Sequence, residues 1–569
     1  MDEQKKNSGY DHVIPDIADW PIYKLSQDRR HFIAEINTFT LERLMQQPTG
    51  KLTDMLSKAI YQERARMKEE PWKVDPPNEK QFWRKIRGQL LGQSLDRSEE
   101  EARATNEEIL RKIIHRYAEE IVGTFQIKTF LFARRFLTLF FTRLLNTAAS
   151  RNWRRFFGSR HRLVDRLLVE GQVEAVRELM KKGTVIMVPT HFSNLDSILI
   201  GYALDSFAGL PSFSYGAGLN LYNTGYTAYF MNRLGAYRVD RRKKNTIYLE
   251  TLKAMSNLSI QRGVNSLFFP GGTRSRSGAL ETKLKLGLLS TAVEAQRGIY
   301  EQGRTEKVFI CPLILSYHFV LEGQFLIEQH LKRMGRERYI KSKDEFYSLR
   351  KLAKFAWQFF SEENDITLSF GQPMDVVGNY VDAQGRSFDQ YGNEIDLREY
   401  FYSSGRVAKD LQRESEYTKQ LGDRIVDRYF RDNIVLTSHL IAFAAFQVLK
   451  NNFKRLDLYG LLRLPAEDYI FPIGTIKDVV AQLRDELRQR AAAGKIKMSE
   501  QLSWDLDKLI ADGVNRLGTY HVDKPLRYNK EGQIISESFK VLYFYHNRLD
   551  GYGLEHTIQW KKEYALQLV

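Results

Sequence analysis

The chain of 569 residues contains a single cysteine, Cys311. One cysteine excludes a disulfide within the chain and any metal site built from several thiolates. It lies in the apolar run VFICPLIL, which predicts an inert buried thiol. No uninterrupted apolar run reaches the roughly 18–20 residues that a membrane-spanning helix needs, and the opening segment MDEQKKNSGYDHVIPD holds no apolar signal region. We therefore expect neither export nor a membrane span, and a soluble or peripheral protein.

Positive charge is what the chain has in excess. Its formal net charge is +16, with 27% charged and 43% hydrophobic residues. The hydrophobic content indicates a folded globular protein, and the length favours two or three domains. A strongly basic balance predicts an anionic partner, which leaves nucleic acid, an anionic membrane surface and phosphorylated small molecules open.

Changes in pattern along the chain predict three units. We expect a helical N-terminal domain over residues 1–160, an α/β domain over residues 161–404 and a mostly helical C-terminal domain over residues 405–569. In the middle unit helical patterns alternate with the apolar runs TVIMV, NSLFFP and KVFICPLILSY, which is typical of a sheet covered by helices. In the last unit DNIVLTSHLIAFAAFQVLK predicts a buried core helix and SFKVLYFYHNRL a strand. Residues 343–361 are predicted to be helical, and YVDAQGRSFDQYGNEIDL to form a hairpin or surface loop.

An aromatic-rich helix is predicted over residues 126–148. Its polar residues fall on one narrow stripe, formed by Lys128, Arg135, Thr138, Thr142 and Asn146. Phe and Leu cover the rest, and RNWRRFFGSRHR follows directly. This combination suits the surface of an anionic bilayer, so we predict that residues 126–157 dock on membranes. The alternative is a core helix followed by a solvated loop; a nucleic-acid arm is less favoured, because the helix is too apolar for that role.

The stretch TVIMVPTHFSNLDSILIGYAL predicts a strand over residues 184–188, a turn, and a helix from about Asp196. His191 falls in the turn and Asp196 at the helix start, where Asn194 and Asp196 are both good N-cap residues. A carboxylate that holds one imidazole nitrogen leaves the other free as a general base. The spacing alone is common by chance, so its context must decide its meaning.

Three further segments each contain or end a predicted strand. GAYRVDR (residues 235–241) ends in a guanidinium. FFPGGTRSRSG (residues 268–278) runs from a strand into a Pro-Gly-Gly turn, where small residues leave backbone N–H groups open and Arg274 and Arg276 offer planar donors to phosphate oxygens. ICPLILSYHFVLEG (residues 310–323) is a strand that ends near Tyr317, which we expect to be a packing residue. A base, its carboxylate and an arginine-lined phosphate cradle are what acyl transfer to a phosphorylated alcohol requires.

These four segments, in this order and spacing, resemble the glycerolipid acyltransferases, and in particular the glycerol-3-phosphate acyltransferases. The motifs RSRSG and YHFVLEG and the C-terminal extension with LYFYHNRL favour the glycerol-3-phosphate branch over the lysophosphatidate branch. The resemblance covers residues 184–325. It implies an α/β fold, a glycerolipid acyltransferase-like sheet flanked by helices, between helical N-terminal and C-terminal domains. It also implies an O-acyltransferase of phospholipid biosynthesis that moves a fatty acyl group from acyl-CoA or acyl carrier protein to the sn-1 hydroxyl of glycerol-3-phosphate.

The resemblance assigns roles to the matching positions. His191 would deprotonate the acceptor hydroxyl and Asp196 would orient the imidazole, and such general-base catalysis is typically worth about 10²- to 10⁴-fold. The residues implied in substrate binding are Arg241, Gly272, Thr273, Arg274, Ser275, Arg276 and Pro312. The arginines would hold the acceptor phosphate, the small residues would shape its loop, and the proline would line the acyl-donor side. We expect no cofactor, no metal and no covalent acyl-enzyme.

Two departures from the family pattern bear on the acceptor. The third segment usually has a glutamate where this chain has Gly271, which removes a hydrogen-bond acceptor for the acceptor's free hydroxyl or for a neighbouring arginine. The second segment is closer to lysophosphatidate acyltransferases, and its Arg238 and Asp240 are expected to pair with each other. For Arg241 the alternative is a solvated basic face, since Arg242, Lys243 and Lys244 continue the run.

The expected partners are glycerol-3-phosphate, the acyl donor and an anionic membrane surface, with the protein peripheral on the cytoplasmic side. Dihydroxyacetone phosphate and 1-acylglycerol-3-phosphate (lysophosphatidate) are the alternative acceptors. From a different class, the chain would be a non-catalytic lipid-binding scaffold on the same fold. A nucleic-acid partner is not expected, because no nucleic-acid-binding motif is present.

Overall fold

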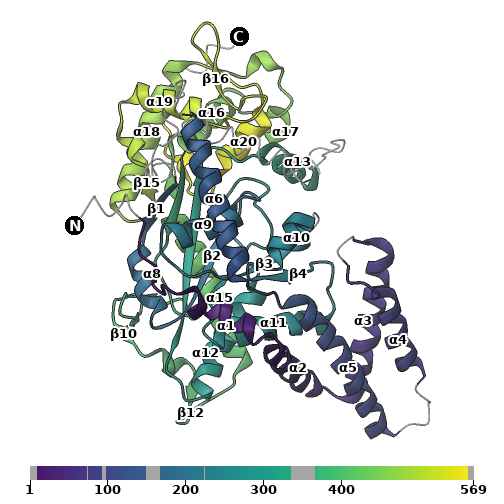
Figure 1. Cartoon of the computed structure of the whole chain (residues 1–569). Coiled ribbons are helices and arrows are strands. Elements are labelled where there is room, and N and C mark those ends of the chain that lie inside the picture. The colour runs from purple at the N-terminus through teal and green to yellow at the C-terminus, as the bar shows by residue number, and fades with distance from the viewer. Residues whose placement is uncertain are drawn as a thin grey trace.

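The structure is a computed structural model, and it describes residues 9–72, 75–92, 98–148, 167–222, 225–334 and 365–561 (Figure 1). For residues 140–148, 220 and 226 it describes the backbone alone. The basic segment 151–162 and the helix predicted over residues 343–361 lie outside the described residues.

Helices form the first part of the chain, as predicted. They are α1 (Pro21–Gln27), α2 (Arg29–Met45), α3 (Thr49–Glu69), α4 (Glu79–Leu91) and α5 (Glu99–Ile121). Helix α5 begins with a capping box, in which Ser98 Oγ accepts from the Glu101 N–H and the Glu101 carboxylate accepts from the Ser98 N–H. Figure 1 shows α2 to α5 projecting from one side of the molecule. Their apolar core is shared with Ile247, Tyr248 and neighbouring residues of α11 (Thr246–Gln261), so the N-terminal helices are anchored on the α/β unit.

A mixed seven-stranded sheet forms the centre, in the order β1-β7-β6-β2-β5-β3-β4. The strands are β1 (Leu167–Gly171), β2 (Gly183–Pro189), β3 (Ser214–Gly218), β4 (Ala236–Val239), β5 (Ser266–Leu267), β6 (Lys307–Tyr317) and β7 (Ile366–Phe370). Strands β4, β3, β5, β2 and β6 run parallel, and β7 runs antiparallel to β6. The register places Gly183 opposite Lys307 and Pro189 opposite Leu313. The carboxyl ends of the parallel strands therefore meet at one edge, where α/β proteins place their functional loops.

Side chains of β2 alternate between two apolar layers, because successive residues of a strand face opposite sides. Val185 and Met187 pack in the layer that contains α8 (Val173–Met180) and α9 (Asp196–Ser206). Ile186 and Val188 pack in the layer that contains α12 (Leu286–Glu301). Both faces of the sheet are thus covered, as a mainly parallel sheet requires. Two further helices of this unit are α10 (Gly225–Met231) and α13 (Gly323–Arg333), and α6 (Ile127–Ala148) lies in the chain between the N-terminal helices and β1.

Helices also dominate the C-terminal part, as predicted. They are α15 (Leu411–Arg431), α16 (Thr437–Asn452), α17 (Leu458–Leu461), α18 (Ile473–Ala492), α19 (Leu506–Arg516) and α20 (Phe539–His546). Every residue of α16 from Thr437 to Leu449 is buried, which confirms the predicted core helix. Its apolar side chains belong to the same continuous core as β2, α8 and α9.

Short elements complete the described chain. The short strands are β8 (Tyr380–Val381), β9 (Ser387–Phe388), β10 (Glu394–Ile395), β11 (Tyr402–Ser403), β12 (Arg406–Val407), β13 (Ile434–Val435), β14 (Ile470–Phe471), β15 (Lys497–Met498), β16 (Arg527–Tyr528) and β17 (Ile534–Ile535). The 3₁₀ turns are η2 (Ile17–Asp19), η4 (Leu219–Tyr222), η6 (Leu397–Tyr400), η7 (Ala466–Asp468), η8 (Glu500–Ser503), η9 (Asn547–Leu549) and η10 (Leu554–His556). Strands β8, β9 and β10 form an antiparallel three-stranded sheet where a hairpin or loop was predicted.

The strand predicted for SFKVLYFYHNRL is wrong, because this segment forms α20 and the turn η9. Aromatic and β-branched residues favoured a strand, but such propensity yields to packing. The apolar residues Phe539, Leu542 and Tyr545 also repeat at helical spacing and are buried. The ring of Phe446, in α16, stacks on that of Phe539, and its centroid lies 4.0 Å from the centroid of the His546 ring. Within the described residues, no helix combines the length and the apolar character that crossing a membrane demands.

Candidate active site

His191 and Asp196 meet at the carboxyl end of β2, as the motif predicts. His191 lies in the loop after the strand and Asp196 is the first residue of α9. His191 Nδ1 and Asp196 Oδ2 are 2.8 Å apart. Because a carboxylate only accepts, this contact requires the proton on Nδ1 and leaves the lone pair of Nε2 free. In the described part of the chain Nε2 has no hydrogen-bond partner, and the side chain is 15% exposed.

Asp196 is held rigidly, although it is fully buried. Its Oδ2 also accepts the backbone N–H groups of Phe192 (2.7 Å) and Ser193 (3.0 Å). Its Oδ1 accepts the hydroxyl of Tyr317 at 2.6 Å, from the end of β6. Four donors thus compensate the burial of one carboxylate. Tyr317 was expected to be a packing residue, so its contact with Asp196 was not predicted, although its place at a strand end was an available signal.

The imidazole ring itself is fixed from one face. Phe269, at the end of the apolar run that follows β5, stacks on His191 with ring centroids 4.1 Å apart. The carbonyl of His191 accepts the N–H of Ser275 at 2.7 Å. The first and third motifs are therefore bonded directly to each other.

Glu322 joins the first, third and fourth motifs. Its carboxylate accepts the Ser193 hydroxyl (2.9 Å) and the Asn194 N–H (3.0 Å). It also pairs with Arg274, whose Nη1 lies 3.1 Å from Oε1. The Glu322 side chain is 2% exposed and that of Arg274 is 14% exposed. Glu322 therefore holds one guanidinium beside the loop of His191.

In the cradle loop, residues 270–276, the N–H groups of Gly272 and Ser275 donate to the carbonyls of Phe269 and His191, so these two are not open as predicted. Gly272 adopts φ +77°, a left-handed conformation that disfavours any residue with a side chain, and the side chain of Lys285 lies beside it. Ser275 Oγ donates to the Ala279 carbonyl at 2.7 Å and closes the turn, while Thr273 is half-buried. Lys285, exposed at the start of α12, adds a cation beside Gly272 that the motif did not reveal.

Arginines from three segments gather next to the cradle loop. Desolvation lowers the pKa of Arg276, and the positive charges of Arg333, Arg274 and Arg241 lower it further. Arg241 is exposed and, among the described residues, has no ion-pair partner. Mutually repelling guanidinium groups with few carboxylates between them attract an anion. Arg333, at the end of α13, is a further member of this cluster that sequence reasoning missed.

The rest of the second motif is structural. The expected pair of Arg238 with Asp240 is wrong: Asp240 pairs with Arg242 at 2.7 Å, and Arg238 lies over the ring of Tyr222. Lys243 is fully buried and pairs with Glu120 of α5 at 2.6 Å. Arg242 and Lys243 therefore do not form a solvated face, and they tie this motif to the N-terminal helices.

Pro312 lies away from these groups, within the buried part of β6 opposite Val188. Its carbonyl accepts the N–H of Gly371. Its role toward an acyl donor stays a prediction. The neighbouring Cys311 is buried as expected, and burial raises the pKa of its thiol.

The segment after α20 closes the site from the C-terminal side. Arg548, which is 5% exposed, donates to the Leu315 carbonyl (2.6 Å) and lies 4.3 Å from the Phe192 ring centroid. Asn547 donates to the Ser277 carbonyl at 2.9 Å. Burial lowers the pKa of Arg548 to about 10. We call Asn547 and Arg548 the C-terminal wall, because they contact the loops of the first, third and fourth motifs.

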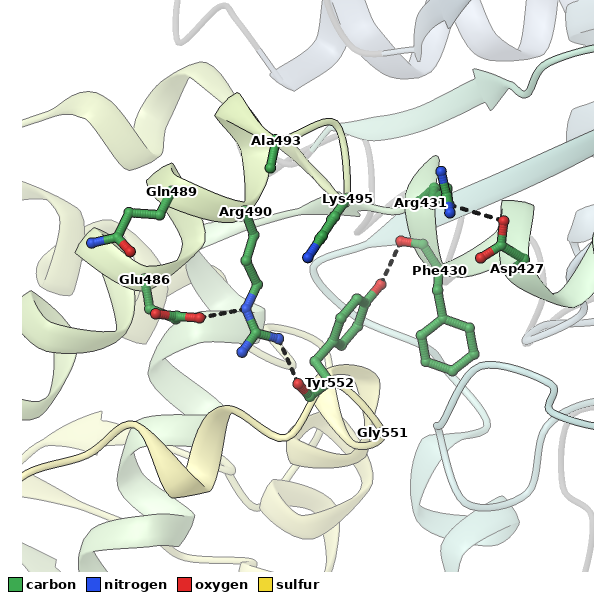
Figure 2. A pocket seen from close by; sticks show the side chains of 10 residues that line it. All are labelled: Asp427, Phe430, Arg431, Glu486, Gln489, Arg490, Ala493, Lys495, Gly551 and Tyr552. Carbon is green, nitrogen blue, oxygen red and sulfur yellow. Dashed lines mark hydrogen bonds and ion pairs between the residues drawn. The ribbon is translucent and has the colours of Figure 1, made fainter. Parts of the chain in front are cut away.

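A pocket of about 660 Å³ lies elsewhere, between α15, α18 and residues 551–552 (Figure 2). Its arginines are already engaged: Arg490 pairs with Glu486 and Arg431 with Asp427. No residue of the four motifs lines it. The described residues also hold no cluster of three His, Cys, Asp or Glu side chains placed to bind a metal ion. The groups suited to acid–base chemistry on an anionic substrate are therefore those at the sheet edge.

Comparisons with known proteins agree with this site. Residues 169–316 match the family model described as Acyltransferase. Over 174 residues the chain is 33% identical to a probable mitochondrial glycerol-3-phosphate acyltransferase of Caenorhabditis elegans, a match that covers 29% of this chain and 24% of the relative. Over 396 residues it is 25% identical to the glycerol-3-phosphate acyltransferase of Shewanella halifaxensis, covering 68% of this chain and 42% of the relative.

A third relative, the glycerol-3-phosphate acyltransferase of Aeromonas hydrophila, is 24% identical over 330 residues, which is 57% of this chain and 36% of the relative. The chain thus spans about a quarter to two fifths of the length of these relatives. Each match supports the resemblance drawn from the four motifs. Residues 169–316 thus match the Acyltransferase family model, and parts of the chain are similar to glycerol-3-phosphate acyltransferases.

Proposed function

We propose that the chain transfers a fatty acyl group from the thioester of acyl-CoA or acyl carrier protein to the sn-1 hydroxyl of glycerol-3-phosphate. The observation that carries the proposal is the oriented His191, whose free Nε2 lies in a loop bonded to the arginine-bearing cradle loop. The names of the relatives support glycerol-3-phosphate as the acceptor.

The chemistry needs one base that becomes an acid. His191 Nε2 removes the proton as the acceptor oxygen attacks the thioester carbonyl. The tetrahedral intermediate then collapses, the carbon–sulfur bond breaks, and the imidazolium returns the proton to the leaving thiolate. Asp196 stabilises the imidazolium between the two steps, as an orienting carboxylate does in other base-assisted acyl transfers.

The acceptor phosphate is placed against the guanidinium groups of Arg241, Arg274 and Arg276. Arginine offers paired donors that match phosphate oxygens. Holding the acceptor by its phosphate presents its hydroxyl to His191 in a defined orientation, and such positioning lowers the entropic part of the barrier. In this scheme Gly272, Thr273 and Ser275 form the loop beneath the phosphate.

Acyl transfer by the purified protein tests the proposal directly. Palmitoyl-CoA is offered with glycerol-3-phosphate, dihydroxyacetone phosphate or lysophosphatidate, and wild type is compared with His191→Ala and with His556→Ala, an exposed histidine, as the control. We expect transfer to glycerol-3-phosphate and a loss of about 10²- to 10⁴-fold in His191→Ala alone. Silence with all three acceptors, from both acyl-CoA and acyl carrier protein, would overturn the proposal in favour of a non-catalytic lipid-binding scaffold.

The membrane surface is the second partner that we propose, with α6 as the segment that contacts it. Phe132, Phe136 and Leu139 are 53–59% exposed on this helix, with the exposed Arg135 among them. Thr138 of the polar stripe contacts the protein, because Tyr202 of α9 donates to its Oγ1 at 3.3 Å, whereas Lys128 and Arg135 of the same stripe are exposed. An apolar face turned to solvent, next to basic residues, fits the surface of an anionic bilayer. The hydrogen bond between Thr138 and Tyr202 joins α6 to α9, the helix that begins at Asp196.

Vesicle flotation tests this surface. We expect the protein to float with vesicles that contain anionic lipid, and the double variant Phe132→Ser, Phe136→Ser to stay in the pellet fraction. Tyr61→Ser, an exposed aromatic residue of α3, is the matched control and should float like wild type. Equal binding to neutral vesicles would remove the electrostatic part of the proposal.

A further inference from the structure

Gly271 is a glycine that its backbone does not require. Unlike Gly272, it does not have a positive φ, so a residue with a side chain could adopt the same conformation. What occupies the place of its side chain is Glu281. A Cβ built on Gly271 would lie 3.0 Å from Glu281 Cγ and 3.2 Å from Glu281 Oε1.

The chain returns Glu281 to this place by folding back on itself. Ser275 closes one turn through Ala279, and the N–H of Lys285 donates to the Pro270 carbonyl at 2.8 Å. These bonds close a loop that starts and ends beside Gly271. A carboxylate ten positions further along the chain therefore lies where a side chain of residue 271 would be.

Glu281 forms a hydrogen bond with the loop that contains His191. Its Oε1 accepts the backbone N–H of His191 at 3.2 Å. Its Oε2 is buried and, among the described residues, has no hydrogen-bond partner. A buried carboxylate oxygen without a partner is costly, and native proteins rarely keep one without a use. Arg548 attracts this carboxylate and Asp196 repels it, which places Glu281 within the same electrostatic site.

We propose that Glu281 is the carboxylate of the acceptor site, brought by the fold-back between Pro270 and Lys285 to the place where a side chain of residue 271 would lie, and that its Oε2 accepts a hydrogen bond from the free secondary hydroxyl of a phosphorylated polyol. This inference rests on the proposed function and deepens it, because it assigns the residue that distinguishes one acceptor from another. In this proposal Glu281 supplies the hydrogen-bond acceptor that a glutamate at position 271 would have provided.

The proposal predicts a specificity. Glycerol-3-phosphate carries a hydroxyl at its middle carbon, which donates to a carboxylate, whereas dihydroxyacetone phosphate carries a carbonyl there, which cannot donate. A site built to bind a hydroxyl discriminates strongly against an analogue without it. Glu281→Gln replaces one oxygen by an amide that donates, so it should reverse part of this preference and still fill the same volume.

The experiment compares kcat/KM for the two acceptors at about pH 8, above the pKa of Glu281, which burial raises to about 7. In Glu281→Gln we expect kcat/KM for glycerol-3-phosphate to fall by about 10- to 100-fold, the value of a hydrogen bond to a charged group, with a smaller fall for dihydroxyacetone phosphate. Thr282→Ala, the exposed neighbour, is the control. A purely structural role would lower both values by the same factor and would overturn the proposal.

An exchange of positions gives a second, independent readout. Gly271→Glu alone should lose activity, since its side chain would collide with Glu281 and add a second carboxylate. Gly271→Glu combined with Glu281→Ala relieves both problems, and should restore kcat/KM for glycerol-3-phosphate at least 10-fold relative to Glu281→Ala alone. No rescue, together with an unchanged acceptor ratio in Glu281→Gln, would refute the proposal.

The proposed function and the assignment of Glu281 are refuted by different results. A folded wild-type protein that acylates no acceptor refutes the proposed function, and the assignment of Glu281 falls with it. An active wild type whose Glu281→Gln variant keeps the acceptor ratio refutes the assignment alone. If Glu281→Gln does not fold, by circular dichroism, Glu281→Asp takes its place, because it keeps the carboxylate and withdraws it by one methylene. It should lower kcat/KM for glycerol-3-phosphate and leave that for dihydroxyacetone phosphate nearly unchanged; an equal loss for both acceptors refutes the assignment.

Discussion

Asp196→Asn separates the charge of Asp196 from its geometry. Asparagine has the same size, and its amide oxygen at the position of Oδ2 can still accept from His191 Nδ1, Phe192 N and Ser193 N. Its NH₂ group then replaces Oδ1 and donates to the hydroxyl oxygen of Tyr317, which only needs to rotate its proton. The substitution therefore keeps the imidazole in place and removes one negative charge.

The magnitude follows from the separation of the charges. Nδ1 and Oδ2 are 2.8 Å apart, so the centres of the imidazolium and the carboxylate are about 4 Å apart, and at an effective dielectric constant of about 20 their attraction is about 4 kcal/mol. This attraction exists only after His191 has taken the proton, so it acts on the transition state. A loss of about 4 kcal/mol corresponds to about 10³-fold in kcat, with little change in the free energy of unfolding.

Initial rates of acyl transfer at saturating acceptor measure the effect, with urea unfolding as the check on stability. Asp205→Asn, a buried aspartate at the other end of α9, is the matched control and should keep its activity. His191→Ala combined with Asp196→Asn should be little worse than His191→Ala alone, since the two residues act as one unit. A rate for Asp196→Asn within about threefold of wild type would show that no imidazolium forms, and the general-base assignment would be refuted.

Three further predictions concern the surroundings of this pair. Tyr317→Phe removes the 2.6 Å hydrogen bond to Asp196 and should lower kcat/KM by about 10- to 100-fold with the circular dichroism spectrum unchanged; an unaltered rate would reduce Tyr317 to packing. Lys243→Met strands the buried Glu120 and should lower the free energy of unfolding in urea by about 3–5 kcal/mol, whereas Met at the exposed Lys244 should not; equal effects would contradict the buried pair. Folding raises the pKa of Glu281 from 4.5 to about 7, so its contribution is complete below pH 4.5 and is lost as the pH rises to 7. Between these values wild type should lose up to about 3 kcal/mol relative to Glu281→Gln, and parallel stability curves would exclude this titration.

The contact between His191 and Asp196 could be predicted from sequence because its geometry is local. His191 and Asp196 lie within one strand–turn–helix unit, so the chain itself brings them together. The turn at Gly272, where the backbone has a positive φ, is local in the same way. The alternation of apolar runs with helical patterns was enough to predict the sheet.

The partners that come from elsewhere in the chain could not be predicted. Tyr317 lies 121 positions from Asp196, and Arg548 lies 233 positions from Leu315. Nothing in the local pattern around such residues says which loop they will contact. The strand predicted for residues 538–549 failed for the same reason, since packing against α16 outweighs the local preference of aromatic residues.

The continuous core has a consequence for what counts as the enzyme's minimal unit. One apolar layer joins β2, α9, α16 and α20, and the C-terminal wall reaches from its far end into the loops of the catalytic motifs. Residues 169–316, the part that matches the acyltransferase family, contain the reacting groups but not the side chains that enclose them. A fragment cut to that match would expose the apolar side chains that share a core with α16 and α20. The boundary near residue 404 thus marks a change of sequence pattern, while the apolar core and the contacts of the C-terminal wall continue across it.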